Sequence, residues 1–204
     1  MSIRTRLIQQ FHRPHGVGGR VSGWVMTHRG SNRERNLWVV SLLDAQPTER
    51  VLEIGFGPGL AVAALARRVT AGQVCGVDHS DVMVRAARRR SAAAVRAGRV
   101  DLRCAPVDRI PDFGVSFDAV FAVNSVGFWP SPAERLAELR RLLRPGGRIA
   151  LATQPRCPGA SAETTGRAGR ELSDLLLEAG FGSPRTETLA LDPPVACVLA
   201  VNPS

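Results

Sequence analysis

The chain has 204 residues, a formal net charge of +9, and 44% hydrophobic and 22% charged residues. This length suits one domain with a substantial core, and the proportions are those of an ordinary globular protein. No apolar run reaches the roughly 18 residues of a membrane span, and the N-terminus lacks the apolar centre of a secretory signal. We therefore expect a cytoplasmic protein.

The four cysteines do not form a metal or disulfide pattern. Cys75, Cys104 and Cys197 lie in apolar, strand-like stretches, Cys157 lies in a loop, and no CxxC pair occurs. The spacing therefore predicts neither zinc nor a disulfide framework. We interpret the cysteines as small residues of a protein in a reducing compartment.

The positive charge is carried by arginine alone, since the chain has no lysine. Seven arginines and one acid, Asp101, lie between Arg85 and Arg103. This density is compatible with RNA binding or with a solvated helix face. Aromatic residues are not interleaved there, which favours the solvated face.

In chain order, residues 1–45 form a basic leader with helical potential. Residues 36–43 read as a buried helix, closed by Pro47. We expect the leader to act as a partial lid over a ligand, in a single domain whose cofactor-binding core spans 46–204.

Short apolar runs alternate with helical patterns from residue 50 onward. The expected strands lie near 50–55, 73–78, 99–104, 117–123 and 147–153. The expected helices lie near 59–69, 81–97, 132–143 and 168–179. This alternation predicts an α/β fold, with a parallel sheet covered by helices on both faces.

Two features punctuate the second half. Pro145-Gly-Gly147 is a helix stop that predicts a sharp turn into the following strand, whereas residues 155–169 are rich in Gly, Ala and Thr and are expected to be mobile. Two strand-like runs near 185–191 and 195–201 have only a predicted turn, Asp192-Pro-Pro194, between them, so they should be antiparallel. The expected sheet has seven strands, six parallel and the last one reversed.

A glycine-rich turn follows the first expected strand, in the sequence VLEIGFGPG of residues 51–59. No Gly-Lys-Ser/Thr follows it, which excludes a P-loop. Gly55 and Gly57 fit the first two positions of a dinucleotide fingerprint, but Leu60 occupies the third. Asp78 ends the second expected strand, where an acid can bind ribose hydroxyls in several nucleoside-binding folds.

The pattern Glu-x-Gly-x-Gly-x-Gly at 53–59 is similar to the first motif of class I S-adenosylmethionine-dependent methyltransferases of the small-molecule type. Four further segments resemble later motifs of that family in the expected order: 76–80, 105–108, 117–124 and 142–150. The resemblance implies a Rossmann-like sheet and methyl transfer from S-adenosylmethionine, which leaves S-adenosylhomocysteine as product.

The same resemblance implies a set of cofactor contacts. Asp78 stands at the ribose position, and Asp108, helped by the backbone of Val107, at the adenine amine. His79 and Met83 flank the adenine position, with plain surface or core packing as the alternative for each. Carboxylates suit this cofactor because it offers hydroxyls, an amine and a sulfonium but no phosphate.

Glu53 has two readings, a contact near the methionine amino group or a brace for the loop N–H groups. The other positions that we assign to the cofactor lie in the glycine turn and after the fourth strand: Gly55, Phe56, Gly57, Gly59, Asn124 and Ser125.

Methyl transfer to an acceptor needs few catalytic groups, because positioning supplies about 7–11 kcal/mol in favourable models and a base is needed only for a poorly acidic hydroxyl. The candidates are Asn124, where the methyl group should emerge, and His28, whose alternative is an exposed or capping histidine. The acceptor pocket is assigned to Trp24, His28, Phe128 and Trp129. The sequence contains no cluster of acids and histidines that would predict a metal site.

The segment after the fourth strand reads Asn124-Ser-Val-Gly127, without the Asn/Asp-Pro-Pro-Tyr/Phe of family members that methylate base or glutamine amines. We therefore expect a small-molecule acceptor, with oxygen slightly ahead of carbon or nitrogen, such as a sugar, polyketide-like or lipid-derived hydroxyl. The alternatives are an RNA methyltransferase and a non-catalytic cofactor-binding protein. The oligomeric state, a homodimer included, stays open.

Overall fold

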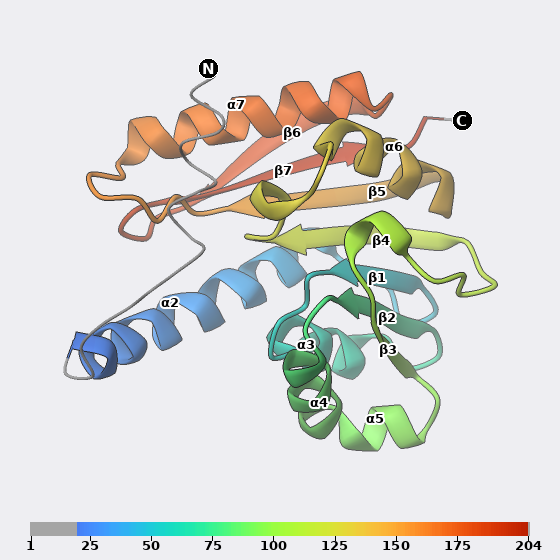
Figure 1. Ribbon diagram of the computed structural model, residues 1–204. Coiled ribbons are helices and arrows are strands. Elements are labelled where there is room, and N and C mark those ends of the chain that lie inside the picture. The colour runs from blue at the N-terminus through green and yellow to red at the C-terminus, as the bar shows by residue number, and fades with distance from the viewer. Residues whose placement is uncertain (1–19, 204) are drawn as a thin grey trace.

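One seven-stranded sheet organises the chain in the computed structural model, which describes residues 20–203, with side chains from residue 30 onward (Figure 1). The strand order is β3-β2-β1-β4-β5-β7-β6. The strands are β1 (Arg50–Ile54), β2 (Gln73–Asp78), β3 (Val100–Cys104), β4 (Phe117–Val123), β5 (Leu143–Thr153), β6 (Gly182–Leu189) and β7 (Val195–Val201).

The pairings confirm the predicted strand directions. Each neighbouring pair from β3 to β5 is parallel, and β7 is antiparallel to both β5 and β6. Six strands therefore run one way and the last runs the other. The predicted turn at 192–194 lies between β6 and β7.

Helices cover both faces of the sheet (Figure 1). They are α2 (Arg20–Leu43), α3 (Leu60–Arg68), α4 (Asp81–Arg90), α5 (Ala92–Arg96), α6 (Pro132–Leu142) and α7 (Ala162–Glu178), with two short 3-10 turns, η1 (Val107–Arg109) and η2 (Val126–Phe128). Because side chains alternate along a strand, Phe121 of β4 packs into the core under α2 to α5, whereas Val120 packs into the core under α6 and α7.

The C-terminal half of α2 is the buried helix that residues 36–43 predict. Val39, Val40 and Leu43 are buried against the sheet, in the same core as α3. This packing fixes the described part of the leader across the sheet near β4 and β5.

Two predicted boundaries were wrong. The single helix expected over 81–97 is divided at Ser91 into α4 and α5. The helix expected to begin near residue 168 begins at Ala162 instead, inside the segment 155–169 that we expected to be mobile, because the Ser161 hydroxyl accepts the N–H of Thr164 and caps the helix. Gly169 lets α7 approach β7 closely, since a Cβ there would lie 3.3 Å from that of Ala196.

The turn expected before the fifth strand instead lies within β5. Phe117 pairs with Leu143 but Ala119 pairs with Arg148, so the residues between form a bulge. Asn202 holds this bulge in place, since its side-chain amide donates to the carbonyl of Leu143 and its backbone bonds Gly146 and Gly147.

No helix among residues 20–203 is both long enough and apolar enough to cross a membrane.

Candidate functional site

The carboxyl ends of β1 and β4 meet where the strand order reverses, which is where open α/β sheets bind ligands. The glycine turn lies at this point, and Gly55, Gly57 and Gly59 all have positive φ. Gly55 has no room for a side chain, because a Cβ there would lie 2.7 Å from the Cβ of Ser125. The Ser125 hydroxyl in turn donates to the carbonyl of Ile54 at 2.8 Å.

Asp78 holds the turn from the adjacent strand. One carboxylate oxygen accepts the N–H of Gly57 at 2.8 Å, and the other accepts the N–H of Ser80 at 2.9 Å. Each oxygen can accept a further hydrogen bond. Asp78 therefore fixes the backbone of the turn and still has acceptor capacity toward a ligand.

Glu53 is the second acid beside the turn, and its side chain is 1% exposed. Burial, with the nearby charge of Asp78 in addition, raises the pKa of Glu53 to about 8. Its Oε2 atom is buried and has no partner among the side chains and backbone that the structure describes. A buried carboxyl group with an unpaired oxygen is poised to accept a hydrogen bond from a ligand.

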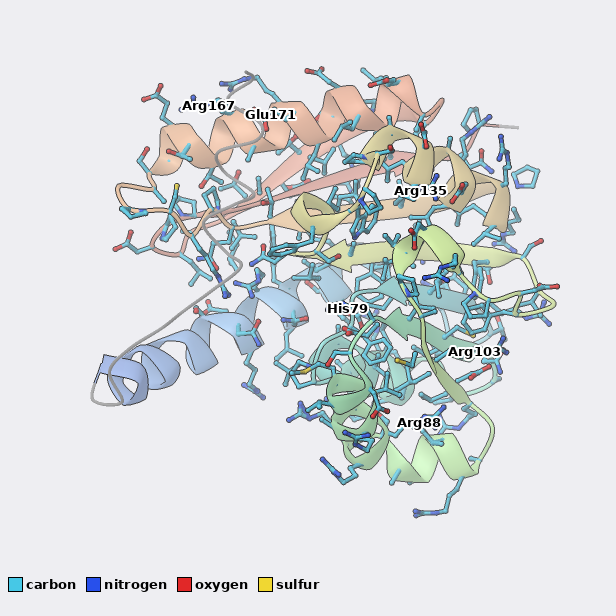
Figure 2. The ribbon with its side chains drawn as sticks, viewed as in Figure 1. His79, Arg88, Arg103, Arg135, Arg167 and Glu171 are labelled. Atoms are coloured by element: carbon cyan, nitrogen blue, oxygen red, sulfur yellow. The ribbon has the colours of Figure 1, made fainter. Side chains whose placement is uncertain are left out.

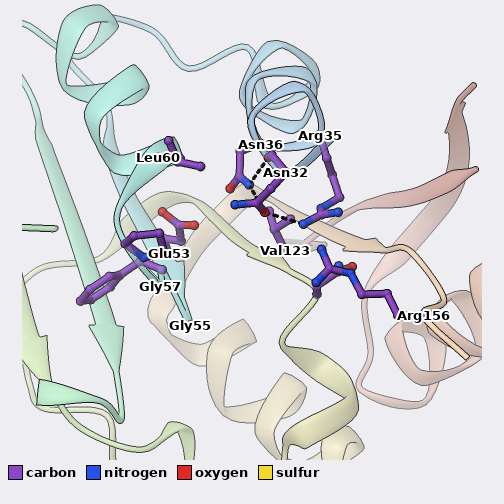
Figure 3. Close-up of a pocket in the computed structure, with 12 residues that line it drawn as sticks. Asn32, Arg35, Asn36, Glu53, Gly55, Gly57, Leu60, Val123 and Arg156 are labelled. Carbon is purple, nitrogen blue, oxygen red and sulfur yellow. Dashed lines mark hydrogen bonds between the residues drawn. The ribbon is translucent and has the colours of Figure 1, made fainter. Parts of the chain in front are cut away.

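A cavity of about 170 Å³ opens between the glycine turn, α2 and the ends of β4 and β5 (Figure 3). One wall is polar and comes from α2: Asn32, Arg35 and Asn36. The opposite wall comes from the end of β1, the turn and the start of α3: Glu53, Gly55, Gly57 and Leu60. Phe56, Pro58, Val123, Asn124 and Arg156 also line the cavity.

Arg35 is the charged residue of the polar wall, and it is only 2% exposed. Its guanidinium donates to Oε1 of Gln154 and, at 2.6 Å, to Oδ1 of Asn32. Burial, and secondarily the charge of Arg156, lowers the pKa of Arg35 to about 10. The site thus holds a cation whose protein partners are neutral amides.

Asn124 lies in the cavity wall with a φ of 55°. Its Oδ1 accepts the N–H of Gln154 at 2.7 Å, and its own N–H bonds the carbonyl of Ala152. The side chain therefore joins the ends of β4 and β5, and only its amide nitrogen has no bond to the described protein.

Four other predicted cofactor residues do not line this cavity. His79 is exposed and Met83 half-buried beside the start of α4, while Val107 and Asp108 form η1 after β3. The Phe56 side chain lies in the core under Gly76, although the residue also borders the cavity.

On the acceptor side, Phe128 is 65% exposed, whereas Trp129 is buried in the core under α6 and α7. Neither lines the cavity. Trp24 and His28 belong to the first turns of α2, which lie outside the part of the chain whose side chains are described.

Sequence reasoning missed the polar wall. Asn32, Arg35 and Asn36 continue the stripe of α2 that buries Val39 and Leu43, at spacings of three and four residues. A run of Asn and Arg resembles a solvated surface. The sequence did contain one signal that these polar residues face the interior, because they continue the apolar stripe of the same helix.

The arginine-rich segment serves the fold. Arg88 donates to the carbonyl of Leu102, Arg103 pairs with Asp101 and lies over the ring of Phe113, and both side chains lie on the β3 side of the molecule (Figure 2). Arg85, Arg90 and Arg99 likewise bond described groups. Five of the seven arginines in this segment thus have partners within the described protein, and Arg88, Arg90 and Arg99 bond backbone carbonyls of other elements.

Among the described residues, no three His, Cys, Asp or Glu side chains are grouped so as to hold a metal ion.

The model of a methyltransferase domain family matches residues 51–147. The chain is 28% identical to the uncharacterized methyltransferase YdaC of Bacillus subtilis, over 90% of this chain and 99% of that protein. An S-adenosylmethionine-dependent methyltransferase from Aquifex aeolicus shares the fold with a TM-score of 0.65 and 21% identity, over 81% of this chain and 88% of that one. The chain belongs to the class I S-adenosylmethionine-dependent methyltransferases.

Within this family, relatives differ in the acceptor atom that their names give. The chain is 29% identical to the O-methyltransferase resE of Aspergillus sclerotiorum, over 68% of this chain and 57% of that protein. Relatives named as C-methyltransferases match as well. The chain spans only 36% to 58% of the length of seven other curated relatives that it matches.

Proposed function

We propose that this methyltransferase transfers the methyl group of S-adenosylmethionine to a small-molecule acceptor, most readily to a hydroxyl oxygen. The observation that carries the proposal is the pair of buried acids, Glu53 and Asp78, beside a glycine turn that opens onto a cavity. The cofactor offers no phosphate, and this turn is flanked by carboxylates rather than by lysine. The two carboxyl groups beside the turn therefore fit S-adenosylmethionine.

The cofactor supplies a methyl group activated by the positive charge of a sulfonium. Asp78 would accept the ribose hydroxyls with its remaining lone pairs, and the unpaired Oε2 of Glu53 would accept from the methionine ammonium. A cationic partner would lower the pKa of Glu53 and ionise it. Asp108, with Val107 beside it, is proposed for the adenine amine, and His79 and Met83 for its ring.

The acceptor would lie beside Asn124, where the cavity passes from the turn toward the ends of β4 and β5. Asn124 would position the acceptor through its free amide nitrogen, since its Oδ1 is engaged by Gln154. Relatives named as O-methyltransferases support oxygen as the acceptor atom. His28 stays the proposed base for a hydroxyl of low acidity.

Calorimetry with S-adenosylhomocysteine tests this assignment. Asp78→Ala is expected to weaken binding by about 10- to 100-fold, because charge-assisted hydrogen bonds to the ribose and the brace on the Gly57 N–H are lost together. Asp81→Ala is the matched control, since Asp81 is an exposed acid three residues away that pairs with Arg85. Equal affinity in Asp78→Ala and the unmodified chain would refute the assigned site.

A further inference from the structure

Arg35 is a buried cation without a counter-ion. Its two bonded partners, Gln154 and Asn32, are neutral amides, and its Nε atom is buried with no partner. Among residues 30–203, no carboxylate lies within ion-pairing distance of its guanidinium. Burying a charge in this way is unfavourable unless a ligand of opposite charge binds there.

A second guanidinium lies beside it. Arg156 comes from the loop after β5, borders the same cavity, and is close enough to Arg35 for its charge to lower the pKa of Arg35. Figure 3 shows the two side chains together at one end of the cavity, with Glu53 and the glycine turn at the other. Arg156 is exposed and has no ion pair with the described residues, so a ligand can reach it. Two adjacent cations repel each other until an anion lies between them.

The position of the pair separates it from the nucleoside contacts. Asp78 ends β2, on one side of the point where the strand order reverses, whereas Gln154 and Arg156 follow β5, on the other side. Gln154 also donates its side-chain amide to the carbonyl of Pro193, which holds Arg35 toward the β5 end. The pair thus faces the half of the cavity left for the acceptor.

We propose that Arg35 and Arg156 bind an anionic group of the methyl acceptor, a carboxylate or a phosphate, so that the acceptor class is a small hydroxylated anion. Two planar guanidinium groups match the paired oxygens of such a group. This inference rests on the proposed methyl transfer, and it narrows the acceptor from any small molecule to a charged one.

The cofactor's own carboxylate is the other source of the same chemistry, and the experiment separates the two. Inorganic phosphate is titrated by calorimetry into the full chain, first alone and then saturated with S-adenosylhomocysteine, which already fills any site for its carboxylate. The variant is Arg156→Gln, an exposed position whose change leaves the core intact. The control is Arg167→Gln, an exposed arginine on α7, on the other side of the sheet (Figure 2).

The expected result is that phosphate binds the saturated protein and that Arg156→Gln weakens this binding at least about tenfold, while Arg167→Gln does not. Phosphate binding that disappears on saturation, with Arg156→Gln weakening S-adenosylhomocysteine but not 5′-methylthioadenosine, which lacks the carboxylate, would assign the pair to the cofactor and overturn the inference. Absent phosphate binding, or equal binding in Arg156→Gln, would overturn it too. Failure of S-adenosylhomocysteine to bind, with Arg156-dependent phosphate binding intact, would contradict the proposed function and not the anion site.

Discussion

Replacing Glu53 by glutamine is expected to stabilise the ligand-free protein, increasingly so as the pH rises from acidic to mildly alkaline. In the folded chain the pKa of Glu53 is raised from 4.5 to about 8, by burial first and by Asp78 second. Above pH 4.5 the unfolded chain releases this proton while the folded chain keeps it, so folding stability falls with rising pH until the folded pKa is passed. The shift corresponds to roughly 4–5 kcal/mol.

Glutamine keeps the shape of the side chain and does not titrate. Urea unfolding at a series of pH values across this window measures the effect, and the expected signature is a flatter dependence of the unfolding free energy on pH in Glu53→Gln. Glu171→Gln is the matched control, because Glu171 is exposed on α7 (Figure 2). Parallel pH profiles for Glu53→Gln and the unmodified chain would show that the carboxyl group is not held neutral by burial.

Substitutions in the glycine turn are expected to have a second large effect. One of them should mainly lower the unfolding free energy, and another should mainly weaken ligand binding. At Gly59 an added Cβ would lie 2.6 Å from the Cβ and 2.9 Å from the Cα of the buried Ala87, at a φ of +75°. Gly59→Ala is therefore expected to lower the unfolding free energy by about 3 kcal/mol or more, since α3 or α4 must shift.

Gly57 has nothing within 4 Å of an added Cβ, although its φ is +53°. Gly57→Ala should lose only about 1 kcal/mol of stability through its backbone conformation and still fail to bind S-adenosylhomocysteine tightly, because the methyl group occupies space where the ligand approaches the backbone. Unfolding curves and calorimetry on the same samples measure both quantities.

Gly98→Ala is the control for both variants. Gly98 has a φ of +71° and open space around it, and it lies between α5 and β3, away from the cavity. It should match Gly57→Ala in stability and the unmodified chain in binding. If Gly57→Ala binds S-adenosylhomocysteine as tightly as Gly98→Ala does, the turn does not contact the ligand.

The sheet could be predicted from sequence because most of its strands are buried on both faces. Segments such as Phe117–Val123 are then continuous apolar runs, and their order along the chain fixes a parallel arrangement. The start of α7 could not be predicted in the same way. A single cap at Ser161 and the close contact of Gly169 with Ala196 outweigh the helix-weakening glycines, and that contact exists only once β7 is in place.

The acids of the candidate site could be named because Glu53 stands next to a recognisable glycine turn and Asp78 ends the following strand. The polar wall could not, since Arg35 reaches the cavity only through the packing of α2 across the sheet and its bond to Gln154, 119 residues away. The positions of the aromatic residues after β4 could not be predicted from the sequence either. The positive φ of Asn124 and the 3-10 turn that follows it direct Trp129 into the core.

Gln154 forms three hydrogen bonds, each to a different part of the molecule. Its backbone N–H bonds Asn124, its amide nitrogen bonds the carbonyl of Pro193, and its amide oxygen bonds Arg35. Gln154 therefore connects helix α2, the end of β4 and the loop between β6 and β7. We expect a substitution near Pro193 to displace the Gln154 side chain and, through it, the guanidinium of Arg35.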